Sequence, residues 1–598
     1  MISKFFCFFD SRERWLLLGQ LLLVFIGSGL EILGVGVIVP FIAMLSNPSI
    51  IQEHSVLSKI YTTFQFSSNQ SFLAASSFAL MAIFIVKNVY LYIAQFVQAQ
   101  FFANKTVKLE SYLLAGYLSQ PYAFYFKHSK SEMLNIVLKG VATFIDRFTR
   151  PILILVAEIT TVTGILLFLV FLEPMPMLIT LSVIGLFVFF FLYTIQRKLV
   201  IAGEEMYFFQ QNTIKWINQS IDSVKENRVF CKLQYFMERY REYAFKNAKI
   251  SVYVSMINFA PRLLIETFVF VGILGFVASI LLSGIDTKTI LPMLALLGVA
   301  AVRILPSITK IMTAVIMIKQ STYVVQEMYE QLKMAENINE QGVNEGKKQK
   351  ISFDQKVELK NINYTYAGTS SLAVSSIDLT INRGQSVAFI GASGSGKSTL
   401  VDILLGLLEL DSGEFLVDGV KISEENITSW REKIGYIPQS IYLLDATLRE
   451  NIAFGLKNDE IDDERVWLSL KIAQLDSFVK DLPQQLETVT GENGILLSGG
   501  QKQRIGIARA LYHDPEILIF DEATSALDNE TEKELNEAIE SLMGQKTLII
   551  VAHRMSTVKK CDNLFLLRDG MIIDSGTFNQ LLSGSQEFRT LSKLSVAN

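Results

Sequence analysis

The sequence predicts two domains of different fold class: an all-α transmembrane domain of six spans, followed by an α/β domain outside the membrane. A chain of 598 residues is expected to contain several domains. Half of the residues are hydrophobic, and long runs of Leu, Ile, Val and Phe are concentrated before about residue 335. The polar, Gly-containing segment 336–350 follows, so we expect domains at 1–335 and 351–598 joined by a linker.

The charge and the cysteines give no sign of a nucleic-acid-binding protein or of a cysteine-based metal or redox site. The formal net charge of −4 gives no sign of a nucleic-acid-binding surface. The three cysteines, Cys7, Cys231 and Cys561, lie far apart and match no metal or redox spacing. The absence of a disulfide framework is typical of a chain whose soluble part faces the cytoplasm.

Six apolar segments reach the roughly 20 residues needed to cross the hydrocarbon core of a bilayer. They are Trp15–Leu45, Ser71–Ala99, Pro151–Leu172, Pro176–Ile195, Phe259–Leu282 and Ile290–Ile318. The first segment is too long for a cleaved signal peptide, and no small-residue cleavage site follows it. We therefore predict a multi-pass membrane protein.

The connections between the spans predict the orientation of the chain. The connections after the second and fourth spans are long and rich in Lys and Arg, whereas the other three carry few cations. Positive residues stay in the cytoplasm, so both basic connections, both termini and the soluble domain are expected to face inward from the inner, cytoplasmic membrane. The basic connections keep a helical pattern, which predicts helices extending well beyond the bilayer. Pro121 is expected to break the first of them.

A short amphipathic helix is predicted near residues 48–64, in the external connection after the first span. Asn47 and Pro48 suit a helix start. Apolar or aromatic residues then recur mostly at three- and four-residue steps: Ile50, His54, Leu57, Tyr61 and Phe64. The pattern leaves two interpretations open, a helix on the outer membrane interface or a helix packed against the bundle.

The segment "SVAFIGASGSGKSTL" combines an apolar strand, a Gly-rich loop and a helix start. Gly391, Gly396, Lys397 and Ser398 fit the pattern G-x-x-x-x-G-K-[ST]. The glycines allow backbone N–H groups to surround phosphates, Lys397 reaches the β- and γ-phosphates, and the Ser398 hydroxyl binds Mg²⁺. The second domain is therefore expected to be an α/β P-loop domain that binds ATP and Mg²⁺.

The segment "EILIFDEATSALD" is a second apolar strand that ends in two acidic residues. Asp521 suits the coordination of Mg²⁺, as in P-loop nucleotide hydrolases generally. Glu522 follows at the carboxyl end of the strand, where an α/β sheet presents its chemistry, and we expect it to polarise the attacking water. The alternative is an acid that only caps the next segment.

The segment "LSGGQKQRIGIARAL", Leu497–Leu511, resembles the signature motif of ATP-binding cassette (ABC) proteins. It lies between the two motifs above, as in that family, and the resemblance extends from Ile351 to about Phe588. In this family two cassettes bind two ATP molecules at their interface. This chain has one phosphate loop and one signature, so the resemblance implies a second copy of the chain as partner, with twelve membrane helices in the homodimer.

The resemblance also implies roles for individual residues. Tyr366 would stack on adenine, Gln439 would sense Mg²⁺ and the membrane domain, and His553 would be the switch histidine. The implied catalytic residues are Glu522, His553 and Gln439, and the implied Mg²⁺ ligands are Ser398, Gln439 and Asp521. The implied ATP-binding residues are Tyr366, Gly391, Ser393, Gly394, Gly396, Lys397, Ser398, Thr399, Ser498, Gly499, Gly500, Gln501 and Asp528.

Six spans followed by one cassette resemble a homodimeric ABC exporter. The resemblance implies two coupling helices that press on the cassettes, which we place near Tyr122–His128 and Gln219–Glu226. ATP would bind the closed cassette dimer preferentially and so bias the membrane domain toward an outward-facing state. Hydrolysis and product release would reset it.

The segment "AAVRILPSITKI" carries Arg303 and Lys310 within an otherwise apolar helix. Seven residues are close to two helical turns, so both side chains share one face. Ionisable residues inside a membrane usually mark a pathway or a ligand site. With Lys87 and Arg262 they predict a cationic lining for an anionic substrate. The alternative is a set of structural ion pairs, joining Arg262 to Glu266 and Glu158 to Lys87 or Arg303.

The segments "GVGVIVPFIAMLSNP", "APRLLIE" and "VRILPSITKI" resemble bacterial flippases of lipid-linked oligosaccharides. This resemblance implies an amphiphilic, anionic substrate taken from membrane lipid, such as a polyprenyl-pyrophosphate glycan, whose pyrophosphate meets Lys87, Arg262, Arg303 and Lys310. A peptide or drug exporter with the same ATP-driven machinery is one alternative. An ATP-gated channel or regulatory subunit is another, against which the intact Glu522 and His553 argue.

Overall fold

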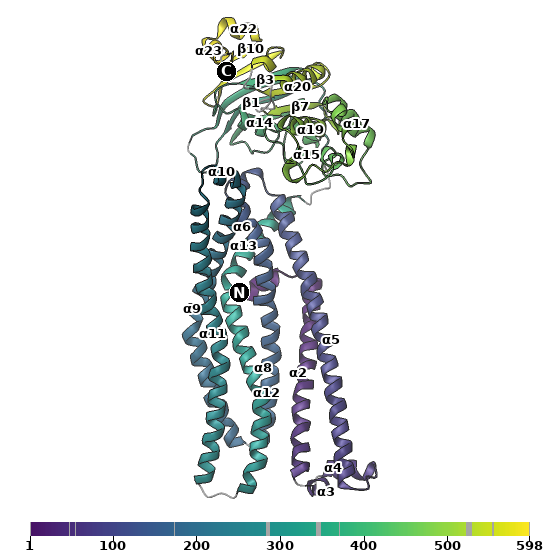
Figure 1. Ribbon diagram of the computed structural model, residues 1–598, viewed down its shortest axis with the longest axis vertical. Coiled ribbons are helices and arrows are strands. Elements are labelled where there is room, and N and C mark those ends of the chain that lie inside the picture. The colour runs from purple at the N-terminus through teal and green to yellow at the C-terminus, as the bar shows by residue number, and fades with distance from the viewer. Residues whose placement is uncertain are drawn as a thin grey trace. The chain divides into compact units, whose positions relative to one another are not determined.

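A computed structural model describes residues 2–46, 48–53, 55–172, 174–282, 287–342, 349–369, 371–521, 529–552 and 555–596. The chain forms two compact units (Figure 1). The first contains residues 1–120 and 128–341 and is helical. The second contains residues 121–127 and 342–598 and holds all the strands that the structure describes.

Each predicted span lies within one long helix of the first unit, and these helices run alongside one another in Figure 1. They are α2 (Ser11–Ser46), α5 (Asn69–Leu118), α8 (Arg150–Leu172), α9 (Pro174–Asp222), α11 (Leu233–Leu282) and α12 (Thr287–Gln320). Within the described residues, five helices are long and apolar enough to cross a membrane, and the sixth predicted span lies on α12. An all-α membrane domain is confirmed.

The helices extend well beyond the bilayer, as the sequence predicts. Helices α5 and α11 have 50 residues each and α9 has 49. At 1.5 Å per residue such a helix is about 75 Å long, more than twice the thickness of a hydrocarbon core. Helix α5 ends at Leu118, and Pro121 precedes the short 3₁₀ helix η1 (Tyr122–Phe126), which belongs to the second unit. The predicted break at Pro121 is therefore confirmed.

Shorter helices complete the first unit. They are α1 (Ile2–Cys7), α3 (Ile50–Glu53), α4 (Ser55–Thr63), α6 (Lys130–Leu134), α7 (Val141–Thr143), α10 (Val224–Val229) and α13 (Thr322–Gly342), with the π-helical turns η2 (Asn135–Gly140) and η3 (Phe144–Thr149). The predicted linker 336–350 is wrong in its first half, because α13 continues to Gly342. Glu and Gln are good helix formers, so a polar segment prolongs a helix that is already anchored in the unit.

The external helix occurs as α3 and α4, which lie at the α2–α5 connection (Figure 1). Leu57 and Tyr61 of α4 pack against a small core that includes Met44 and Phe72. A second apolar row, Val56, Ile60 and Phe64, is exposed. The helix thus packs on the bundle through one face and exposes apolar residues on another. His54 lies outside the described residues.

The second unit contains two sheets. The four-stranded sheet has the order β2 (Val374–Asn382), β1 (Lys356–Tyr364), β4 (Ser412–Val417), β5 (Val420–Lys421). The six-stranded sheet has the order β10 (Met571–Gly576), β9 (Asn563–Arg568), β3 (Ser386–Ile390), β8 (Thr547–Val551), β7 (Ile517–Asp521), β6 (Ile434–Ile437). Strands β9, β3, β8, β7 and β6 are parallel, and β10 is antiparallel to β9. The α/β fold class is confirmed.

Helices surround these sheets. They are α14 (Lys397–Leu404), α15 (Ile427–Arg431), α16 (Leu448–Ile452), α17 (Asp463–Ile472), α18 (Asp476–Asp481), α19 (Gly499–Leu511), α20 (Asn529–Leu542), α21 (Met555–Val558), α22 (Phe578–Gly584) and α23 (Gln586–Val596), with the 3₁₀ turns η5 (Gln485–Glu487) and η6 (Glu492–Gly494).

The central strands are buried on both faces, which explains their continuous apolar runs. Every residue of β3 and β8 is buried. Ala388 and Ile390 of β3 pack into one hydrophobic core, whereas Val387 and Phe389 pack into another. Because successive side chains of a strand point to opposite faces, the two cores lie on opposite sides of the sheet.

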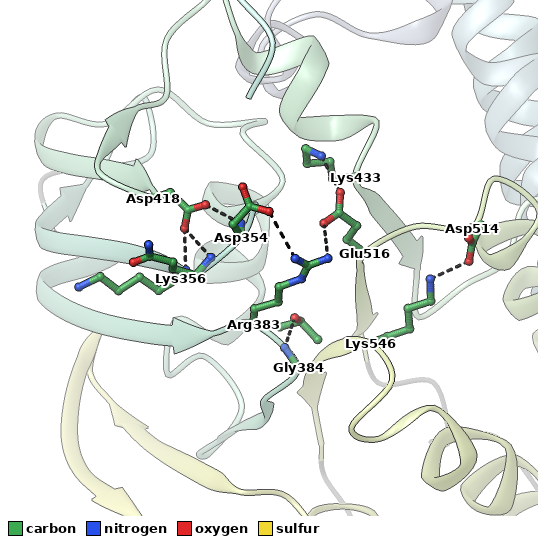
Figure 2. A network of polar contacts seen from close by, with 11 residues as sticks. Asp354, Lys356, Arg383, Gly384, Asp418, Lys433, Asp514, Glu516 and Lys546 are labelled. Carbon is green, nitrogen blue, oxygen red and sulfur yellow. Dashed lines mark hydrogen bonds and ion pairs between the residues drawn. The ribbon is translucent and has the colours of Figure 1, made fainter. Parts of the chain in front are cut away.

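A polar network holds the amino ends of three of these strands (Figure 2). Arg383 lies between Asp354 and Glu516, with nitrogen–oxygen distances of 3.4 Å to each carboxylate. Lys433 Nζ also contacts Glu516, at 2.6 Å. Arg383, Lys433 and Glu516 lie just before β3, β6 and β7, respectively. The network therefore ties these strands together at one edge of the sheet, and their carboxyl ends meet at the opposite edge.

Close helix packing in the first unit makes a testable prediction at Gly203 of α9. A Cβ placed there would lie 2.1 Å from the backbone oxygen of Gln320, whereas one at Gly185 of the same helix meets nothing within 4 Å. We expect Gly203→Ala to destabilise the protein by about 1–3 kcal/mol, because backbone must shift to admit the methyl group. Gly185→Ala should be neutral or slightly stabilising. Thermal unfolding of the purified protein measures both, and equal midpoints would contradict the close packing.

Candidate functional site

The phosphate loop joins β3 to α14 and depends on its glycines. Gly394 and Gly396 have φ values of +81° and +98°. A Cβ at Gly396 would lie 2.8 Å from the backbone oxygen of Ala373, and one at Gly391 would lie 2.3 Å from that of Leu567. Only glycine fits these positions without strain. The loop leads into the amino end of α14, where backbone N–H groups and the helix dipole favour phosphate.

Lys397 lies over this loop. Its side chain is buried, and Nζ donates hydrogen bonds to the carbonyl oxygens of Gly391 at 2.9 Å and Ala392 at 3.0 Å. Phosphate oxygens can replace these carbonyls as acceptors for the ammonium group. Ser398, the next residue, is exposed, and Ser393 and Gly394 at the tip of the loop are exposed as well. The predicted phosphate-binding residues are therefore brought together by the strand–loop–helix.

Tyr366 is anchored beside the loop. Its hydroxyl shares a hydrogen bond with Thr399 Oγ1 at 3.0 Å, which ties it to α14. Its ring meets the edge of Phe126, with the ring centroids 5.6 Å apart. Phe126 belongs to η1, so the predicted first coupling helix contacts the aromatic residue expected to stack on adenine. Burial raises the pKa of Tyr122 in the same helix, and the charge of Asp402 adds to the effect.

The register of the sheet places the remaining site elements at one edge. Asp521 at the end of β7 lies opposite Val551 of β8, and Val551 lies opposite Phe389 of β3. Strand β6 is aligned with β7 in the same way, and the exposed Gln439 follows two residues after it. The phosphate loop, Asp521 and the loop that carries Gln439 therefore begin at the same edge.

Negative charge accumulates around Asp521. Burial and the neighbouring charge of Asp521 raise the pKa of Asp402 from 3.8 to about 6. The Tyr436 hydroxyl donates to Asp521 Oδ2 at 3.4 Å, and burial together with both carboxylates raises the pKa of this tyrosine. A divalent cation would relieve this repulsion, and hydroxyl and carboxylate oxygens are the ligands that Mg²⁺ prefers.

The residues present thus fit Mg²⁺, which would be held by Ser398, Asp521 and Gln439. Bound there, it would neutralise phosphate charge. Asp402 was not among the predicted site residues. It lies on α14 four residues after Ser398, so the i,i+4 spacing within the helix is the signal that identifies it. Tyr122 and Phe126 lie in the predicted first coupling helix, but their interactions with Asp402 and Tyr366 were not predicted, because these interactions are tertiary.

The signature segment forms the amino end of α19. The Ser498 side chain accepts a hydrogen bond from the Gln501 backbone N–H at 3.3 Å, and the Ser498 N–H donates to Gln501 Oε1 at 2.8 Å. This capping box stabilises an exposed helix start, at which Ser498 and Gly499 are accessible and Gly500 is buried. An exposed helix start of this kind suits the phosphate of a nucleotide.

Three predicted residues lie outside the described chain: Glu522, Asp528 and His553. Their roles as catalytic base, D-loop acid and switch histidine therefore stay predictions.

Two of the four membrane cations are held in ion pairs between helices. Lys87 Nζ on α5 lies 3.1 Å from Glu31 Oε2 on α2 and 4.7 Å from the centroid of the Phe84 ring. Lys310 Nζ on α12 lies 2.6 Å from Glu158 Oε1 on α8. The sequence paired Glu158 with Lys87 or Arg303; the structure pairs Glu158 with Lys310 and Lys87 with Glu31, and the pairing with Arg303 stays a prediction. Helix packing decides this, since α2 packs against α5 and α8 packs against α12.

The other two membrane cations lie on α11 and α12. Arg262 and Glu266 are both exposed, and these two described residues form no ion pair with each other, so the predicted i,i+4 pair is wrong. Arg303 lies on α12, but its side chain lies outside what the structure describes.

The fold and the site define a class of protein. A phosphate loop, an acidic β7 end and a capped signature helix make the second unit an ABC nucleotide-binding domain, and the first unit is a bundle of membrane-spanning helices. Residues 374–525 match the family model described as ABC transporter.

Known proteins support this class along most of the chain. An "ATP-dependent lipid A-core flippase" of Albidiferax ferrireducens is 29% identical over 523 residues, covering 86% of this chain and 88% of that protein. Proteins of the same name match over shorter segments: the one from Pseudoalteromonas translucida is 41% identical over 40% of this chain and 41% of its own length, and the one from Escherichia coli K12 is 39% identical over 43% and 44%.

A solved structure of a bacterial Atm1-family ABC exporter with ATP bound shares the fold. Its TM-score is 0.78 at 20% sequence identity, with 98% of this chain and 100% of that chain covered. The chain thus has the fold of a half-size ABC exporter, a membrane domain fused to one nucleotide-binding domain. The ABC transporter domain and the flippase relatives support ATP hydrolysis coupled to transport.

The raised pKa of Asp402 predicts a pH dependence of stability. An acid whose pKa is higher in the folded state binds its proton more tightly there, so its contribution favours folding below pH 3.8 and is lost as the pH rises to about 6. In nucleotide- and Mg²⁺-free protein, Asp402→Asn should therefore become progressively more stable than wild type between about pH 4 and 6. Above pH 6 the difference should stay constant. Thermal unfolding across this range measures it.

Asp418 provides a control of opposite sign. Burial opposes its ionisation, but hydrogen bonds from the backbone N–H groups of Asp354, Gln355 and Lys356 prevail and lower its pKa (Figure 2 shows Asp418 with part of this network). Its contribution to stability is present above the unfolded pKa and is lost as the pH falls. Asp418→Asn should therefore lose stability relative to wild type at neutral pH. If both variants became more stable, or both less stable, than wild type at neutral pH, the opposite pKa shifts of Asp402 and Asp418 would be contradicted.

Proposed function

We propose that two copies of this chain form a homodimeric exporter of the inner membrane that uses ATP to flip an anionic, amphiphilic lipid. The observation that carries the proposal is the likeness to a lipid A-core flippase over 86% of this chain, because this alignment extends into the membrane domain. The charged residues of the spans support an anionic headgroup, and the apolar spans and exposed row of α4 support a lipid tail.

In this proposal each ATP lies between the phosphate loop of one subunit and the signature helix of its partner. Lys397 and Ser398 bind the phosphates and Mg²⁺, and Ser498 at the exposed start of α19 contacts the same nucleotide from across the interface. Glu522 polarises the attacking water, Gln439 senses Mg²⁺ and His553 acts as the switch histidine. The closed, ATP-bound dimer favours the outward-facing state, and hydrolysis reverses the change.

Mixed dimers test the shared sites. Lys397→Ala removes the phosphate-binding cation and Ser498→Ala removes the signature cap, so each variant alone should hydrolyse ATP very slowly. In a mixed dimer one site carries both defects and the other carries neither. We expect mixing to restore up to roughly a quarter of the wild-type rate, because about half of the dimers are mixed and each has one intact site.

Steady-state ATP hydrolysis after exchange of subunits measures this recovery. A mixture of two preparations of the same variant is the control, and it should recover nothing. Hydrolysis at the full rate by a proven monomer would contradict the arrangement.

The substrate proposed in detail is a polyprenyl-pyrophosphate glycan whose pyrophosphate meets Arg303 and Lys310, with Lys87 and Arg262 extending the cationic surface. Arg303 suits this role, because its planar guanidinium binds phosphate oxygens through two parallel hydrogen bonds. Both residues lie on α12, seven positions apart and hence on one face. Support comes from this placement of cations in apolar helices.

Arg303→Ala tests the substrate. We expect flipping of a fluorescent polyprenyl-pyrophosphate glycan in proteoliposomes to slow roughly tenfold or more, since hydrogen bonds to a charged group are lost. Basal ATP hydrolysis should persist, because the cassette is unchanged. Arg303→Lys should flip the lipid at an intermediate rate, because it keeps the positive charge but loses the planar guanidinium that forms two parallel hydrogen bonds.

Two outcomes would contradict the assignment. Loss of folding or of basal hydrolysis in Arg303→Ala would make Arg303 a structural residue. Flipping at the wild-type rate would remove it from the substrate path and favour a peptide or drug exporter.

A further inference from the structure

The ion pair between Glu158 and Lys310 is incomplete on the side of the carboxylate. The Glu158 side chain is 9% exposed, and its Oε1 accepts a hydrogen bond from Lys310 Nζ at 2.6 Å. Its other oxygen, Oε2, is buried and has no hydrogen-bond partner among the described residues. Among the described residues, a single hydrogen bond therefore holds the carboxylate. This arrangement is costly, because a buried charged group has an unsatisfied oxygen.

The ammonium of the same pair is accessible. The Lys310 side chain is 54% exposed, although its partner is almost fully buried. An ammonium group has three donors, and within the described chain the one recorded hydrogen bond of this group goes to Glu158. Lys310 can therefore turn to an incoming anion without first leaving a closed core.

A second buried pair in the same unit shows the contrast. Lys105 Nζ also lies 2.6 Å from a carboxylate, that of Glu13, but its side chain is only 4% exposed. Both oxygens of Glu13 are satisfied, Oε2 by Lys105 and the Asp10 backbone N–H, and Oε1 by Lys108. The Glu13 pair is complete and enclosed, whereas the Glu158 pair is neither.

A further polar group lies beside the incomplete pair. Ser307 is three residues before Lys310 on α12, so the two side chains are neighbours on the helix surface. The Ser307 residue is fully buried, and its hydroxyl has no hydrogen-bond partner in the described part of the chain.

We propose that Glu158 is a specificity-determining residue that occupies the Lys310 ammonium until the anionic headgroup of the substrate displaces it. The inference rests on the proposed function and adds a selection step to it. An anionic headgroup can replace the carboxylate at the ammonium, whereas a neutral lipid offers nothing to compensate the broken pair. The carboxylate therefore excludes neutral amphiphiles from Lys310 and lowers the apparent affinity for the anionic substrate.

The test compares Glu158→Gln with wild type as full-length dimers in proteoliposomes. The probes are a polyprenyl pyrophosphate, the corresponding neutral polyprenol and inorganic pyrophosphate. Direct binding and the concentration for half-maximal stimulation of ATP hydrolysis are measured for each. Glu158→Gln should bind the polyprenyl pyrophosphate about tenfold more tightly, the gain expected if the carboxylate covers the ammonium for about nine-tenths of the time. It should discriminate less against the polyprenol.

Matched variants separate this role from a structural one. Glu13→Gln removes a carboxylate from the complete pair and should leave the affinity for the lipid unchanged. Glu158→Gln combined with Lys310→Gln keeps a neutral, foldable pair and should lose the gain in affinity. Thermal unfolding confirms that each variant folds.

The outcomes are distinguishable. If wild type responds to the polyprenyl pyrophosphate and Glu158→Gln binds it equally or more weakly, the selection role is overturned and the proposed function stands. If neither protein responds to this lipid or to inorganic pyrophosphate, both are overturned. If wild type binds inorganic pyrophosphate as tightly as the polyprenyl pyrophosphate and Glu158→Gln gains affinity for both, the selection role is supported for a free phosphate, and the lipid substrate is overturned.

Discussion

The parallel alignment of β3, β8 and β7 is the constraint on which the nucleotide site depends. Asp521, Val551 and Phe389 lie in one row across the sheet, so the phosphate loop and Asp521 leave the sheet at the same edge. The pairs around Glu516 hold the amino ends of β3, β6 and β7 at the other edge (Figure 2). Backbone hydrogen bonding, rather than any single catalytic side chain, therefore sets the positions from which the phosphates and Mg²⁺ are bound.

The site near Asp521 and the ion pairs of the spans show the same physical principle in opposite forms. Around Asp521, burial and the neighbouring like charge raise the pKa of Asp402, and this excess of negative charge favours a cation. In the membrane domain unlike charges are paired across helices, because an isolated charge in an apolar helix is costly. Each arrangement has one unsatisfied feature, an excess of negative charge or an unbonded Glu158 oxygen, and each of these is where we place a ligand.

Elements with strong local patterns were predictable from the sequence. Five of the six spans, the long helical extensions, the break at Pro121, the helix near 48–64 and the P-loop domain match helices and strands at the expected places, and the sixth predicted span lies on α12. The first half of the linker was not predictable, because α13 continues to Gly342 through residues that no longer show an apolar pattern. Periodicity reports where a helix is buried, and a helix anchored at one end can continue beyond its buried part.

The sequence by itself determined which residues can do chemistry: the glycines and Lys397 of the phosphate loop, Asp521, the signature segment and the unusual cations of the spans. These signals depend on residue type and local spacing, which a sequence displays directly. Only the tertiary structure decided which groups meet. Glu158 pairs with Lys310 and Lys87 with Glu31, Phe126 reaches Tyr366, and Asp402 joins Asp521. The physical reason is that helix packing and strand order bring together residues far apart in the sequence, and no local pattern records that choice. Lys87 and Glu31 are 56 positions apart, and Glu158 and Lys310 are 152 positions apart.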